Sequence, residues 1–111
     1  MINVYYKTNS MKITTLSWNV NGVRAAVRKG FTDFLLSKKP HILGIQEVKI
    51  DDTKRNIEKF DFAKYSEHWN SADRPGYAGT MTLLKEKSQI EKRFISHTTG
   101  IGKKEYDTEG R

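Results

Sequence analysis

The chain has 111 residues, of which 36% are hydrophobic and 30% charged, and its 20 Lys and Arg outnumber its 13 Asp and Glu. This size suits one domain with a small core, and the net charge of +7 favours a polyanionic partner such as nucleic acid, although a generally basic surface has the same composition. The absence of cysteine excludes disulfides, thiolate metal sites and thiol nucleophiles, and no apolar run is long enough to span a membrane.

The first ten residues, Met1 to Ser10, contain one Lys and no long apolar segment, so they do not form a signal peptide. Met11 is a second possible translation start. Residues 1–10 are therefore interpreted as an extension or an alternative start, and residues 11–111 as the domain. The lack of cysteine and of a membrane segment leads us to expect a cytoplasmic protein.

Ile13 to Val20 alternates apolar and polar side chains and predicts a strand that ends in an Asn-Gly turn. From Val23 to Leu35, apolar residues recur at helical spacing, which predicts one amphipathic helix that stops at Pro40. His41 to Ile45 is a short apolar run, typical of a strand buried on both faces. Strand, helix and strand in this order allow a parallel pair joined by a crossover.

The second half of the sequence has weaker signals. Residues 51–58 predict a short helix that begins with two acids, and Tyr65 to Ala72 and Thr80 to Leu84 predict strands around a turn. Ser88 to Ser96 is predicted to contain one more strand, and Gly100 to Arg111 is interpreted as a polar loop.

Asn19 and Glu47 end the two strands that flank the predicted helix. Ligands of open α/β sheets bind at this edge, and a carboxylate with an amide oxygen is a partial shell for Mg²⁺. A lone Glu at the end of a strand is more often solvated or salt-bridged, so these two residues alone do not establish a metal site.

Three motifs resemble those of the exonuclease III and apurinic endonuclease family, in the family's order. The first is Ser17 to Ala25 (SWNVNGVRA), and the second is Gly44 to Lys49 (GIQEVK). The third joins Trp69 to Ala72 with Arg74 to Thr80 (RPGYAGT). Asp107 to Arg111 is similar to the segment that precedes the family's next core strand. The resemblance therefore runs from about Met11 to the last residue.

The resemblance implies an α/β fold, the first half of a four-layer sandwich of the endonuclease–exonuclease–phosphatase type. It also implies a DNA-repair nuclease with 3′-to-5′ exodeoxyribonuclease and abasic-site endonuclease activity, dependent on Mg²⁺ with Mn²⁺ as an alternative. The expected partner is double-stranded DNA that carries abasic sites or 3′ ends. No membrane is expected as a partner.

Carried onto this sequence, the family's roles make Glu47 the principal metal ligand, with Asn19 beside it. Arg and Lys side chains at the DNA-facing edge would contact phosphates rather than read bases. For Tyr77 the alternative is a packing aromatic in a turn, and for Arg24 and Lys49 it is a solvated charge. The expected DNA-binding residues are Asn21, Arg24, Lys49 and Tyr77.

The family's general base, water-orienting residues and transition-state stabilisers lie in the second half of a longer chain, so no catalytic residue is assigned here. We expect the 111-residue chain to be inactive alone, with the missing carboxyl-terminal half as a partner. Two alternatives are a non-catalytic nucleic-acid-binding fragment and a phosphodiesterase of the same fold that acts on RNA or a small phosphorylated substrate.

Overall fold

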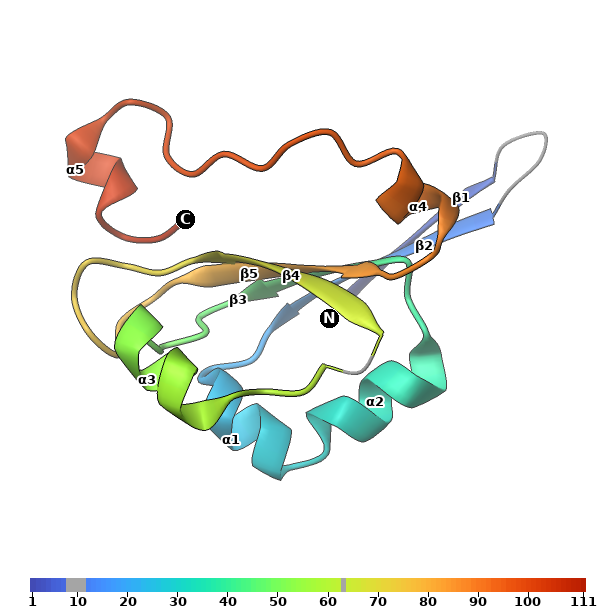
Figure 1. Cartoon of the computed structure of the whole chain (residues 1–111), viewed down its shortest axis with the longest axis horizontal. Helices are drawn as coiled ribbons and strands as arrows, with labels where there is room; N and C mark the ends of the chain where they lie inside the picture. Colours follow the sequence, from blue (N-terminus) through green and yellow to red (C-terminus); the bar gives the residue numbers. More distant parts are fainter. Residues whose placement is uncertain (8–11, 63) are drawn as a thin grey trace.

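One five-stranded sheet with the order β1-β2-β3-β5-β4 organises the chain (Figure 1). The computed structural model describes residues 1–7, 12–62 and 64–111. Three helices lie on one face of the sheet, and the carboxyl-terminal segment runs across the other face (Figure 1). The expected α/β class is confirmed. The strands are β1 (Ile2–Lys7), β2 (Lys12–Asn19), β3 (Ile42–Gln46), β4 (Tyr65–Asn70) and β5 (Thr80–Lys85).

The centre of the sheet is the predicted strand–helix–strand unit. β2 and β3 pair in parallel, with Leu16 opposite Leu43 and Asn19 opposite Gln46, while all other neighbours are antiparallel. The two strands therefore end side by side. This register places the side chains that follow them at one edge of the sheet, as the order of the elements suggested.

The single helix expected from Val23 to Leu35 is instead two helices, α1 (Val23–Arg28) and α2 (Phe31–Lys38). Gly30 separates them with a φ of 105°, a left-handed conformation that glycine adopts without the Cβ clash of other residues. The same apolar spacing continues on both sides of Gly30. The break therefore leaves no trace in the hydrophobic pattern.

The core lies between the sheet and the helices α1 and α2, whereas α3 (Asp52–Glu58) contributes no buried residue. Leu43, Ile45 and Leu83 of the central strands are almost completely buried, and Phe31 packs on them from α2. The ring of Trp18 stacks 5.6 Å from that of Phe31. Trp18 and Trp69 are only partly buried, but both pack against this core, as expected.

The second half contains α3 (Asp52–Glu58), β4 and β5 close to their predicted positions. The strand predicted within Ser88 to Ser96 is wrong, because that region forms the short helix α4 (Gln89–Lys92). Ser88 accepts a hydrogen bond from the backbone N–H of Glu91, whose carboxylate accepts one from the N–H of Lys87, so capping favours the helix. The predicted loop from Gly100 also contains a helical turn, α5 (Lys104–Asp107).

Residues 2–7, within the segment interpreted as an extension, form β1 and pair antiparallel with β2. The second possible start, Met11, and residues 8–10 lie outside the described residues. Within the described ranges, no helix has the length and apolar character needed to cross a membrane.

Candidate functional site

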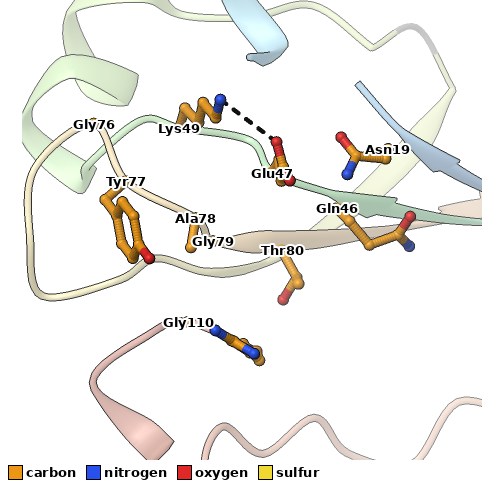
Figure 2. Close-up of a pocket in the computed structure, with 11 residues that line it drawn as sticks. Asn19, Gln46, Glu47, Lys49, Gly76, Tyr77, Ala78, Gly79, Thr80 and Gly110 are labelled. Carbon is orange, nitrogen blue, oxygen red and sulfur yellow. Dashed lines mark ion pairs between the residues drawn. The ribbon is translucent and has the colours of Figure 1, made fainter. Parts of the chain in front are cut away.

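A pocket of about 560 Å³ opens where β2, β3 and β5 meet the carboxyl-terminal segment (Figure 2). Asn19, Gln46 and Thr80 stand in one row across the sheet, because Asn19 pairs with Gln46 and Gln46 with Thr80. The loop after β3 and the loop before β5 complete this side. The lining residues are Asn19, Gln46, Glu47, Lys49, Gly76, Tyr77, Ala78, Gly79, Thr80, Gly110 and Arg111.

Glu47 is the acid of the pocket, directly after β3. A hydrogen bond from the Asn19 amide lowers the pKa of the Glu47 carboxyl, and Lys49 lowers it further through a hydrogen bond and its charge. The Lys49 Nζ lies 3.4 Å from Glu47 Oε2 (Figure 2). Glu47 is therefore a carboxylate at neutral pH, as a metal ligand must be.

Asn19 faces Glu47 in a defined orientation. Its Oδ1 accepts a hydrogen bond of 3.0 Å from the backbone N–H of Asn21, which leaves the amide N–H₂ group to donate to the carboxylate. The oxygen of Asn19 retains a second lone pair. In this arrangement the amide orients Glu47 and still offers an oxygen beside it.

The expected DNA-binding residues also converge on this edge. Lys49 Nζ donates to Asn21 Oδ1, and Arg24 Nη2 donates to the Lys49 carbonyl at 3.3 Å. Tyr77 lines the pocket with 45% of its surface exposed, and the guanidinium of Arg74 lies 5.2 Å from its ring centre. The structure therefore brings together all six residues predicted for the site. Asn21 and Arg24 contact Lys49 but do not line the pocket.

Several residues at this edge adopt left-handed backbone conformations that are unusual for residues with a Cβ. The φ angles are 48° at Asn21, 54° at Glu47, 52° at Lys49 and 39° at Ala78. Each such residue costs about 1–3 kcal/mol and persists only where its surroundings hold it. Among the described residues, four of the eight non-glycine residues with a positive φ lie at this edge, and such strained residues cluster at active sites.

A ladder of backbone hydrogen bonds holds these strained residues. Glu47 O accepts from Gly22 N at 2.8 Å, so the first turn of α1 is tied to the loop after β3. On the other side, Val48 N donates to Gly79 O at 3.1 Å and Lys49 N to Ala78 O at 2.8 Å. The loop that carries Glu47 is therefore fixed between two other segments of the chain.

Four further residues line the pocket without a role predicted from the sequence: Gln46, Thr80, Gly110 and Arg111. Gln46 and Thr80 could have been found from the alignment of strand ends. Gly110 and Arg111 could not, because only the path of the chain across the open face of the sheet brings them to Glu47.

The donor chemistry of the pocket fits a hard divalent cation in part. Among the residues that the structure describes, no group of three or more His, Cys, Asp or Glu side chains could enclose a metal. Mg²⁺, however, keeps several waters and takes one or two carboxylates together with phosphate oxygens. One ionised carboxylate, Glu47, beside the amide oxygen of Asn19 suits that mode of binding.

Comparison with known proteins gives consistent matches. Residues 16–102 match the sequence profile of the Endonuclease/Exonuclease/phosphatase family. The chain is 39% identical over 104 residues to a DNA-(apurinic or apyrimidinic site) endonuclease of Dictyostelium discoideum, covering 93% of this chain and 26% of that protein. It is 37% identical over 97 residues to an exodeoxyribonuclease of Bacillus subtilis, covering 86% of this chain and 35% of that protein.

Among solved structures, the AP endonuclease LMAP from Leishmania major superimposes with a TM-score of 0.57 and 27% identity. The alignment covers 68% of this chain and 24% of that one. The chain thus spans between a quarter and about a third of the length of these relatives.

Proposed function

The chain belongs to the endonuclease/exonuclease/phosphatase family, and from this premise we propose that it carries the metal and phosphate pocket of a Mg²⁺-dependent DNA nuclease. The proposed reaction is phosphodiester hydrolysis, with 3′-to-5′ exodeoxyribonuclease action and incision at abasic sites. The names of the relatives, an apurinic endonuclease and an exodeoxyribonuclease, support this class of substrate. The observation that carries the proposal is the convergence of ionised Glu47 with Lys49, Asn19 and Tyr77 in one pocket.

We assign Glu47 as the metal ligand and Asn19 as the residue that orients it. A bound divalent cation supplies Lewis-acid polarisation of a phosphoryl oxygen. Lys49 provides a positive charge next to the carboxylate and can turn from Glu47 to a phosphate oxygen, since its Nζ is 3.4 Å from Oε2 and the side chain is 39% exposed. Mn²⁺ suits the same oxygen ligands.

The DNA backbone would lie along the edge formed by Asn21, Arg24, Lys49 and Tyr77. These side chains contact phosphate and sugar, so binding would depend strongly on salt and little on sequence. Arg24 supports this edge from α1 through the Lys49 carbonyl, and Tyr77 offers an exposed ring and hydroxyl on the opposite loop.

Proton transfer is a separate requirement of hydrolysis. Glu47 is the only acid that lines the described pocket, and Asn19 and Lys49 keep it ionised. A general base that activates water is therefore not assigned to this chain. We propose that the 111-residue chain binds metal and DNA but does not by itself hydrolyse DNA efficiently, and that residues of a carboxyl-terminal half would complete the site.

The test is fluorescence anisotropy with three labelled nucleic acids, each in excess Mg²⁺: a duplex that contains a tetrahydrofuran abasic analogue, an intact duplex and an RNA duplex. We expect DNA binding with a clear preference for DNA over RNA. The logarithm of the association constant should fall linearly with the logarithm of the salt concentration, with a slope of about −0.9 for each phosphate contact. A preference for RNA would favour the alternative phosphodiesterase. Rapid Mg²⁺-dependent incision of the abasic duplex by the purified chain would contradict the assignment of an incomplete catalytic set.

A further inference from the structure

The turn that begins at Gly100 is closed by one carboxylate. Asp107 accepts hydrogen bonds from three consecutive backbone N–H groups, those of Ile101 at 2.8 Å, Gly102 at 3.0 Å and Lys103 at 2.9 Å. Gly100 has a φ of 80°, and a Cβ there would lie 2.9 Å from the Asp107 carboxyl carbon. The Asp107 side chain therefore neutralises a row of aligned peptide dipoles and holds the turn shut.

The four residues that follow Asp107, Thr108 to Arg111, pack against the loop that joins β4 to β5; we call them the wall segment. Asp73 N donates to Thr108 O at 2.8 Å, and Gly79 N donates to Glu109 O at 3.4 Å. Asn70 Nδ2 donates to the carbonyl oxygen of Arg111 at 3.0 Å. The wall segment is thus attached at both of its ends, to this loop and to the last residue of β4.

Gly110 allows the close approach. Its φ is 65°, and a Cβ at this position would lie 2.5 Å from the backbone N of Ala72 and 2.7 Å from Asn70 O. Only a residue without a side chain fits between these groups. Figure 2 shows Gly110 on the side of the pocket opposite Glu47.

The wall segment and the Glu47 loop are joined through a single glycine. Gly79 N donates to Glu109 O, and Gly79 O accepts from Val48 N at 3.1 Å. Arg111 lines the same pocket as Glu47 and Lys49, and Glu109 pairs with the Arg111 guanidinium. Arg111 is thus a cation on the far wall of a site that already contains Lys49.

We propose that Asp107 is a positioning residue for the pocket. By closing the turn at Gly100, its carboxylate sets the start of the wall segment, so that Arg111 stands across from Glu47 and Lys49 and meets a phosphate of the ligand. This inference rests on the proposed DNA-binding function. It adds that one wall of the site depends on an acid that does not line the pocket.

The test compares Asp107→Ala and Asp107→Asn with Glu105→Ala, an exposed acid in the same helical turn. Amide hydrogen exchange is measured at Asp73 and Gly79, the two residues whose backbone N–H groups donate to the wall segment. Exchange should accelerate in Asp107→Ala, less in Asp107→Asn, which retains one acceptor oxygen, and not in the Glu105→Ala control.

Anisotropy with the abasic duplex measures the consequence for binding. Asp107→Ala should weaken DNA affinity about tenfold and Arg111→Ala by a similar factor, as expected for one charge-assisted hydrogen bond. Each change should reduce the salt slope by about 0.9, the contribution of one phosphate contact. The double variant Asp107→Ala/Arg111→Ala should bind like Arg111→Ala alone, since both changes remove the same contact.

The proposal would be overturned if the losses of DNA affinity multiplied in the double variant while the salt slope of Asp107→Ala stayed unchanged. That result would mean that Asp107 contributes only to general stability. Unchanged exchange at Asp73 and Gly79 in Asp107→Ala would overturn it as well. If the wild-type chain does not bind DNA, the proposed function fails, while the exchange rates still decide whether Asp107 positions the wall segment.

Discussion

At the scale of single residues, Glu47 combines a strained backbone with an ionised side chain. Its backbone is left-handed, with a φ of 54°, and its side chain is kept ionised by Asn19 and Lys49. The side chain lines the pocket beside Lys49. Glu47 is therefore the residue whose replacement should affect ligand binding most with the least effect on packing.

For Glu47→Gln we expect weaker binding of Mn²⁺, measured by paramagnetic broadening of nearby amide signals. The loss should be at least about tenfold, because even changes to residues that only orient metal ligands cost 10–100-fold. Glu58→Gln, at the exposed end of α3, is the control and should bind Mn²⁺ like the wild type. Equal affinity of the Glu47→Gln chain would remove Glu47 from the proposed metal site.

Alanine substitutions at two glycines of the loop before β5 distinguish the cost of backbone strain from the cost of side-chain crowding. Gly76 has a φ of 71° and open space around a Cβ, whereas Gly79 has a φ of 81° and a Cβ there would lie 2.8 Å from Val48 Cγ2. Gly76→Ala should lower the free energy of unfolding by about 1 kcal/mol, from strain alone. Gly79→Ala should lower it by a further ~1–3 kcal/mol from overpacking.

Urea denaturation of both variants measures the difference. Because Val48 follows Glu47 directly, the Gly79→Ala chain should also lose DNA affinity, whereas Gly76→Ala should lose less. Equal unfolding free energies for the two variants would show that Val48 moves aside without cost.

At the scale of elements, the amino end of α3 depends on a side-chain cap. Asp51 Oδ1 accepts from the Lys54 N–H at 2.8 Å, and Asp51 has the extended backbone typical of this position. Asp51→Ala should destabilise the chain by about 1 kcal/mol, while Asp51→Asn should retain most of the stability because its oxygen can still accept. Thermal unfolding of the pair measures this, and similar losses in both would mean that the charge rather than the cap stabilises α3.

His41 ties β2 to β3 through two hydrogen bonds. The imidazole Nδ1 of His41 accepts a hydrogen bond from the backbone N–H of Thr14 at 3.0 Å. The backbone N–H of His41 donates to the carbonyl oxygen of Thr14 at 2.9 Å. Burial, with a smaller effect of the nearby Lys85 charge, lowers the pKa of the His41 imidazole below 6.5. A protonated ring cannot accept the Thr14 N–H, so protonation and this hydrogen bond exclude each other.

A lowered pKa in the folded chain means that the unfolded chain binds the proton more readily. The stability contributed by neutral His41 is therefore complete above pH 6.5 and is lost as the pH falls through the lowered pKa. Urea unfolding at about pH 7.5 and 5.5 should show a smaller decrease for His41→Asn than for the wild type, since Asn accepts at either pH. An unchanged decrease would assign the pH dependence to other groups, of which His68, with a similarly lowered pKa, is the first candidate.

At the scale of the whole molecule, the two faces of the sheet are covered unequally. The helices bury one face tightly, whereas the carboxyl-terminal segment crosses the other with Ile95 94% and Ile101 76% exposed. Hydrogen exchange should therefore be slowest in β3 and β5 at the centre of the sheet and fastest in residues 94–102. Protection of residues 94–102 as strong as that of β3 would contradict this view of the molecule.

Much of the fold could be predicted because its signals are local. The alternation in β2, the apolar run of β3 and the helical spacing after Val23 each report burial within a few residues. Both strands were confirmed, but β3 is not buried on both faces as expected, because its buried residues Leu43 and Ile45 alternate with half-buried ones. The spacing after Val23 was confirmed as helical, although it forms two helices. The break at Gly30 and the helix α4 were missed for a different reason. A glycine turn does not disturb a periodic pattern, and a capping pair outweighed the strand character of Ile90 and Phe94.

The sequence by itself determined the α/β class, the family motifs and the positions of Asn19 and Glu47 at two strand ends, because residue type and spacing act over short stretches of chain. The tertiary structure alone decided that Lys49, Tyr77 and Arg111 share one pocket with Glu47. It also decided that Gly110 must be a glycine, because its close neighbours belong to residues 70–72. Glu47 and Arg111 are 64 positions apart in the sequence, and contacts at that separation depend on the path of the whole chain rather than on local sequence.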